Sequence, residues 1–199
     1  MAFVIPLGAL APETDESPAA RRLRVAGRLF GAVFGILLAV NVTLLAVAVW
    51  AVLFYGGDHL QIGSTSAWVG AGEAPAGFRP FAALSLNHRL AYGLVALVRA
   101  APAVMIFWNL RALFRLYERG VVFARENTER IQWVGVLLAA DALAPFACHL
   151  FLSLTGLEID RGWLHATSFQ ELLLGGMVFV IAQVMQLGRE IEADRAQFV

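Results

Sequence analysis

Four long apolar runs, separated by segments with very different arginine content, constrain this chain more than any other feature. All its fixed positive charge comes from 15 arginines, since the sequence contains no lysine. Most of them lie before the first run, between the second and third runs, or after the fourth; the other connecting segments carry only Arg79, Arg89 and Arg161. Because cytoplasmic loops hold the excess of arginine, this pattern predicts four membrane spans with both chain ends in the cytoplasm.

The runs also predict the fold class and the domain organisation. About 20 apolar residues cross a bilayer, and we expect spans at 29–55, 90–110, 131–154 and 169–187. In lipid, helices satisfy all their backbone groups internally, so we expect an all-α, antiparallel four-helix transmembrane bundle. Residues 1–28 are expected to form a cytoplasmic N-terminal arm, 29–187 the membrane domain, with an outer loop at 57–89, and 188–199 a cytoplasmic tail.

Composition indicates the compartment in which the protein resides and the class of protein to which it belongs. Hydrophobic residues make up 59% of the chain, whereas soluble domains contain about 45–50%. The N-terminus lacks the basic segment of a cleaved signal peptide, and the single cysteine, Cys148, excludes an intramolecular disulfide framework. Arginine without lysine is typical of a GC-rich bacterial genome, so we expect a multi-pass protein of the bacterial inner membrane.

The segment between the second and third spans contains local helix signals. The second helix is expected to continue to Tyr117 and to end at Gly120, which adopts left-handed backbone angles without strain. A new helix is expected after Phe123, with Glu126 and Glu129 in its early turns, where carboxylates favour the helix dipole.

Two stretches carry a family resemblance. LFRLYERGVVFARENTERIQWVG (113–135) resembles the central signature of a bacterial four-span family catalogued as domain of unknown function 2975, and AQVMQLGREIEADRAQFV (182–199) resembles its closing motif. Ala124 departs from the pattern, in which a Ser or Thr cap follows Phe123. The resemblance implies no enzymatic activity, and it suggests a membrane partner for a cytoplasmic helix-turn-helix regulator.

An intramembrane charge pair is the sharpest candidate site. Arg99 and Asp141 each lie about 15–17 Å from the inner ends of the second and third spans, at 1.5 Å per residue. An unpaired charge at that depth is costly, so we expect a buried pair. It could serve as a gate, a proton relay or an anion site, or simply fix the register of two helices.

Helical spacing extends this pair into a polar stripe. The stripe predicts an outward-facing polar cavity; the alternative is an ordinary bundle interior with satisfied polar groups. Its members are His88, Tyr92, Cys148, Glu171 and Asn41. The histidines His59, His88, His149 and His165 show no close metal motif, so metal or haem binding is the weakest hypothesis, and we predict no metal site and no cofactor.

A ridge of small residues runs along the first span. Gly27, Gly31, Gly35 and Ala39 recur every four residues, a pattern that lets two helix backbones approach closely. Asn41 points about 200° away from this ridge. If Asn41 faces the charge pair, the ridge faces outward and favours a homodimer or a partner helix; the alternative is packing within the bundle.

The cytoplasmic side offers a candidate partner surface formed by Phe114, Tyr117, Arg119 and Arg125. Interleaved glutamates argue against nucleic acid, which favours a cleanly basic face. The alternative is charge that only sets topology and contacts lipid.

No phosphate-binding glycine loop, nucleophile elbow, HExxH motif or cysteine pair occurs in the sequence, so we expect no enzyme. Two functions remain open. The first is a small interaction or regulatory membrane protein that engages a cytoplasmic or membrane partner. The alternative is a transporter-like module that binds a small solute or ion in the outward-facing cavity.

Overall fold

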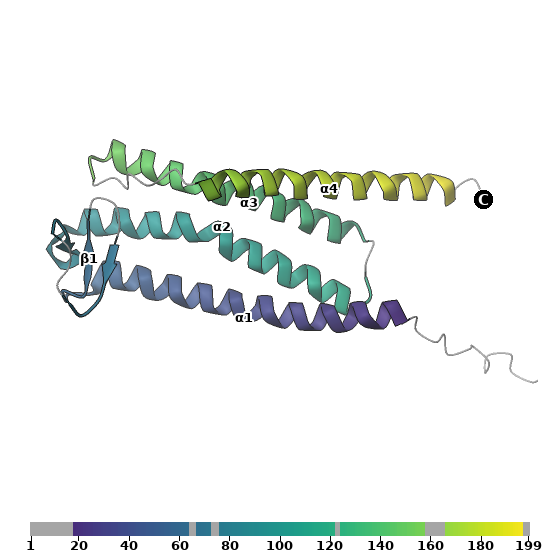
Figure 1. Ribbon diagram of the computed structural model, residues 1–199, viewed down its shortest axis with the longest axis horizontal. Helices are drawn as coiled ribbons and strands as arrows, with labels where there is room; N and C mark the ends of the chain where they lie inside the picture. Colours follow the sequence, from purple (N-terminus) through teal and green to yellow (C-terminus); the bar gives the residue numbers. More distant parts are fainter. Residues whose placement is uncertain (1–17, 64–66, 73–75, 122–123, 158–165, 197–199) are drawn as a thin grey trace, which may run out of the picture.

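Four long helices form most of the structure, a computed structural model that describes residues 18–63, 67–72, 76–121, 124–157 and 166–196 (Figure 1). They are α1 (Pro18–Phe54), α2 (Leu86–Glu118), α3 (Arg125–Leu154) and α4 (Ala166–Ala196). Within these ranges each helix is long and apolar enough to cross a membrane. The prediction of an all-α bundle with four helices of membrane-spanning length is therefore confirmed. The first 17 residues of the predicted arm, and His165, lie outside the described residues.

The helices are longer than the apolar runs alone predicted. Helix α1 begins at Pro18 and contains 37 residues, which corresponds to about 55 Å against a hydrocarbon core of about 30 Å. Pro18 stands in the first turn, where proline needs no backbone donor, and no second proline follows it before Phe54. Residues 18–28 of the predicted arm are thus part of α1, and residues 188–196 of the predicted tail are part of α4.

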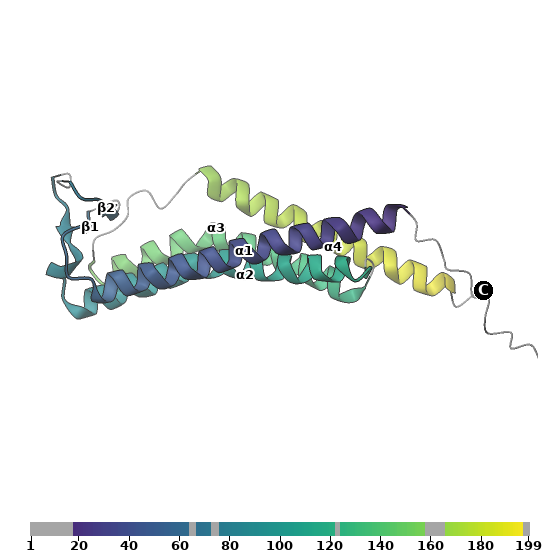
Figure 2. The ribbon, with the colours of Figure 1, turned by 90° about the horizontal axis from the view of Figure 1, so that it is seen from below.

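Helices that are consecutive in the sequence pack against each other. The extensive contacts within the described residues join α1 to α2, α2 to α3 and α3 to α4 (Figures 1 and 2). The start of α1, the end of α2, the start of α3 and the end of α4 lie at one end of the bundle (Figure 1), which we call the arginine-rich end. The side of a membrane on which this end lies stays a prediction.

The turn between α2 and α3 has the geometry that its sequence predicts. Gly120 has φ +78°, its N–H donates to the Tyr117 carbonyl, and the Val121 N–H donates to the Leu116 carbonyl. This pair of bonds is the Schellman motif that closes a helix on a left-handed glycine. Helix α3 begins after Ala124 without a side-chain cap, in agreement with the departure noted above.

A small sheet covers the opposite end of the bundle. Strands β1 (Leu60–Ile62), β2 (Ala67–Val69) and β3 (Arg79–Pro80) pair antiparallel in the order β2-β1-β3, and the 3-10 helix η1 (Phe81–Ala83) follows. The Phe81 side chain is 3% exposed and packs edge-on against Tyr92 of α2, with ring centroids 5.8 Å apart. This apolar contact attaches the loop to the helices.

Candidate functional site

The two residues of the predicted charge pair lie on neighbouring helices, but they are not fully buried and do not contact each other directly. Arg99 on α2 is exposed and Asp141 on α3 is half-buried. No ion pair within 4.0 Å joins them in the described part of the chain. Arg99 is nevertheless near enough for its charge to act on both Asp141 and Cys148. A functional or structural role for the pair stays a prediction.

The other residues of the predicted polar stripe bond or pack locally. The Asn41 amide donates to the Leu37 carbonyl of its own helix over 2.9 Å. Tyr92 packs on Phe81, and the buried Cys148 thiol lies 3.9 Å from the Val95 carbonyl.

His88 and Glu171 complete the predicted stripe. His88 is exposed near the start of α2, and Glu171 is half-buried on α4. The stripe residues thus come from helices that pack in sequence order, α1 on α2, α2 on α3 and α3 on α4, and a polar cavity among them stays a prediction.

From Gly27 to Gly35 the small-residue ridge faces α2, in line with the alternative of packing within the bundle and not with an outward-facing ridge. A Cβ added to Gly27 would stand 2.6 Å from the Glu118 backbone nitrogen and 2.9 Å from the Phe114 carbonyl oxygen. The absent side chain therefore lets the two backbones approach closely. The outward argument assumed that Asn41 needs a partner on another helix, whereas it bonds within its own.

Beyond Gly27, the ridge makes looser contact with α2. Gly31 faces the Phe114 Cβ at 3.8 Å and Gly35 faces Arg111, while Ala39 is exposed. Close backbone contact is thus confined to the Gly27 end of the ridge.

The aromatic half of the predicted partner surface, Phe114 and Tyr117, is half-buried. The Phe114 ring packs against Phe30 and Phe34 of α1, with centroids 5.2 and 5.5 Å apart, and Tyr117 packs edge-on against it. The Phe114 ring therefore helps to hold α1 to α2, and a role for these half-buried rings in binding a partner stays a prediction. Arg119 and Arg125, in contrast, are exposed.

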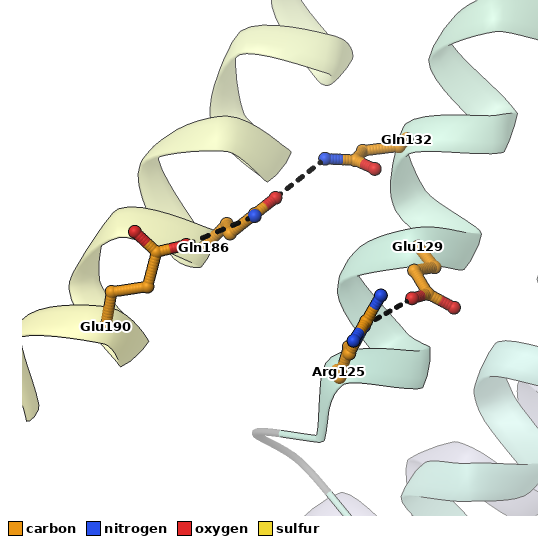
Figure 3. Close-up of polar contacts among 5 residues, drawn as sticks. All are labelled: Arg125, Glu129, Gln132, Gln186 and Glu190. Carbon is orange, nitrogen blue, oxygen red and sulfur yellow. Dashed lines mark hydrogen bonds and ion pairs between the residues drawn. The ribbon is translucent and has the colours of Figure 1, made fainter. Parts of the chain in front are cut away.

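A polar network that sequence reasoning missed joins α3 to α4 near the arginine-rich end (Figure 3). Gln132 donates to the Gln186 side-chain oxygen over 3.3 Å, and Gln186 donates to Glu190 over 3.2 Å. On α3, about one turn before Gln132, Arg125 and Glu129 form an ion pair of 2.7 Å. No local motif marks Gln132 and Gln186 as partners, because they lie 54 positions apart.

A groove between α1 and α2 lies at this end. Its volume is about 420 Å³. One wall is formed by α1 and includes the small residues Gly31 and Gly35, and the other includes Arg111 and Arg115 of α2. The groove therefore places much of the predicted ridge against two arginines of α2.

The described residues contain no group of three or more His, Cys, Asp or Glu side chains arranged to hold a metal ion. Of the histidines considered as ligands, His59 instead contacts the Gly70 carbonyl through Nδ1, over 3.2 Å.

Comparison with known proteins identifies a family but no characterised relative. A family model described as "Protein of unknown function (DUF2975)" matches residues 58–198. This range includes the signature at 113–135 and nearly all of the closing motif. No curated protein and no solved structure matches the chain.

Proposed function

The chain belongs to the DUF2975 family of proteins of unknown function, and from that premise we propose that it is a regulatory membrane protein whose arginine-rich end engages a partner protein. We place it in the bacterial inner membrane with this end in the cytoplasm, because arginine-rich segments stay on that side. We propose no enzymatic activity for it.

The observation that carries this proposal is the length of the helices. Helices α1, α2, α3 and α4 contain 37, 33, 30 and 31 residues, whereas about 20 suffice to cross the hydrocarbon core. The charged residues of α2 and α3 are concentrated at the arginine-rich end. The surplus helical turns at that end therefore form a charged stem that projects from the bilayer.

At the tip of the stem, by which we mean the end of α2 and the start of α3, a buried side chain joins the two helices, which favours recognition of a partner. Asn127 is fully buried and donates to the Val121 carbonyl over 2.8 Å, which ties the start of α3 to the end of α2. Arg119 and Arg125 flank this tie and are exposed. Exposed arginines beside this tie suit an acidic protein surface, with Arg119 as the main contact because Arg125 is also paired with Glu129.

The transporter-like alternative draws less support from the same helices. It needs an outward-facing polar cavity, whereas the Asn41 amide bonds to its own helix, Tyr92 packs on Phe81 and the Cys148 thiol lies against the Val95 carbonyl of α2.

Charge reversal at the tip tests the proposal. The tagged full chain would be purified from native membranes as wild type, as Arg119→Glu with Arg125→Glu, and as Arg22→Glu. Arg22 is an exposed arginine of α1 at the same end and serves as the control. A stoichiometric partner retained by wild type and control but lost by the double variant is expected. Equal recovery with all three proteins, or no partner with any, would contradict the proposal.

A further inference from the structure

We propose that the groove between α1 and α2 binds one anionic phospholipid, with the lipid phosphate held by Arg111 and Arg115. The groove is lined by charged side chains at its outer end and by small or apolar side chains farther along. A molecule that fills it therefore combines an anionic head with an apolar tail.

The charges that line the groove do not cancel. Arg28 Nε lies 3.0 Å from Glu118 Oε1, so these two neutralise each other. Arg111 and Arg115 have neither an ion-pair nor a hydrogen-bond partner among the residues that the structure describes. Two positive charges remain without a counterion from the protein.

Arg111 lies inside the groove and not above it. Its Nε is 3.3 Å, and its Cζ 3.7 Å, from the position that a Cβ on Gly35 would occupy, and the residue is half-buried. A partly desolvated guanidinium without an anion is costly. A phosphate group compensates it well, because the planar guanidinium donates two parallel hydrogen bonds to phosphate oxygens.

The groove points from the membrane surface toward its interior. Gly27 lies beside Glu118 and Gly35 beside Arg111, so the antiparallel helices carry the groove inward to Ile36 and Ala39. Ile36 is 64% exposed and meets lipid acyl chains in a membrane. An acyl chain on this small-residue wall continues directly from a phosphate at Arg111.

These features favour a lipid over a soluble anion. Trp108, three residues before Arg111, is 61% exposed, and exposed tryptophan is typical of the headgroup level. Basic sites between membrane helices on the cytoplasmic side bind anionic headgroups. Free phosphate would use only the charged end and leave the apolar end empty.

Native mass spectrometry of the full chain in detergent tests the proposal. The protein would be titrated with phosphatidylglycerol, with phosphatidylcholine and with inorganic phosphate. Three variants would be compared with wild type: Arg111→Gln with Arg115→Gln, Arg119→Gln with Arg125→Gln as a control that removes equal charge elsewhere, and Gly35→Leu, which fills the groove without changing its charge. Circular dichroism and gel filtration would verify folding.

We expect wild type and the control to retain one phosphatidylglycerol in preference to phosphatidylcholine. Retention should fall roughly tenfold or more in the Arg111–Arg115 variant, because each arginine near an anionic lipid adds attraction, and Gly35→Leu should reduce it as well. Equal loss in the control, equal binding of phosphatidylcholine, or displacement of the lipid by equimolar inorganic phosphate would overturn the proposal. If a variant does not fold, the comparison of the three ligands on wild type still decides between a lipid site and a free-anion site.

Discussion

Gly135 on α3 and Gly175 on α4 lie backbone against backbone. A Cβ added at Gly135 would stand 2.8 Å from the Gly175 carbonyl oxygen, and one added at Gly175 would stand 2.7 Å from the Gly135 carbonyl oxygen. Real Cβ atoms do not approach other atoms so closely, so each glycine is needed for the approach of the other. Membrane helices lack a hydrophobic drive to associate, and such close contacts supply van der Waals packing instead.

The first prediction concerns this contact. Gly175→Ala should lower the free energy of unfolding by about 1–3 kcal/mol, because a rigid backbone must move to make room. Gly176→Ala is the matched control, since nothing lies within 4 Å of its added Cβ, and alanine there should be neutral or slightly stabilising. Denaturation in detergent measures both; equal stability of the two variants would contradict the close packing of α3 on α4.

The second prediction tests the orientation of the α1 ridge. Gly27→Ala should destabilise the α1–α2 pair by about 1–3 kcal/mol, because its Cβ would meet the backbone of residues 114–118. Gly31→Ala should be tolerated, since its Cβ would lie 3.8 Å from the Phe114 Cβ, an ordinary contact. Thermal melting and gel filtration would be measured together. A change of oligomeric state in Gly27→Ala with unchanged stability would restore the outward-facing ridge.

The third prediction concerns the tie at the tip of the stem. Asn127→Ala removes the bond to the Val121 carbonyl, which leaves that carbonyl without its side-chain donor and should cost about 1–3 kcal/mol. Asn109→Ala is the control. It removes a bond to the Met105 carbonyl, but that carbonyl also lies in the regular α2 ladder, so the loss should be small. Hydrogen exchange at residues 119–128 should speed up in Asn127→Ala alone; unchanged exchange would show that the tie is not needed.

The spans and the end of α2 could be predicted from the sequence because their signals are local. An apolar run of about 20 residues has few other solutions in lipid, and Gly120 occupies the position at which a helix commonly ends on a left-handed residue. The lengths of α1 and α4 were underestimated, because an apolar run shows where a membrane span lies but not how far the helix continues through polar residues.

The orientation of helix faces could not be predicted in the same way. Periodicity shows which residues share a face of α1, but not whether that face meets α2 or another molecule. Asn41 gave a misleading argument, since a polar side chain in a helix can bond to the carbonyl four residues before it. Gly135 begins only a single four-residue step, to Ala139, and Gly175 has no small residue four positions away, so neither glycine stood out.

The last prediction concerns Arg99 and Asp141, whose interaction the sequence suggested and whose direct bridge the described residues do not form. Arg99→Ala removes a charge that acts on Asp141, and an isolated charge at the centre of a span costs roughly 2.5–3.5 kcal/mol on insertion scales. Arg99→Ala alone should therefore be less stable than Arg99→Ala combined with Asp141→Ala. The comparison requires all four proteins of the double-mutant cycle, unfolded in the same detergent. A coupling energy near zero would show that the two residues act independently, whereas recovery of stability in the double variant would establish the pair as a determinant of α2–α3 packing.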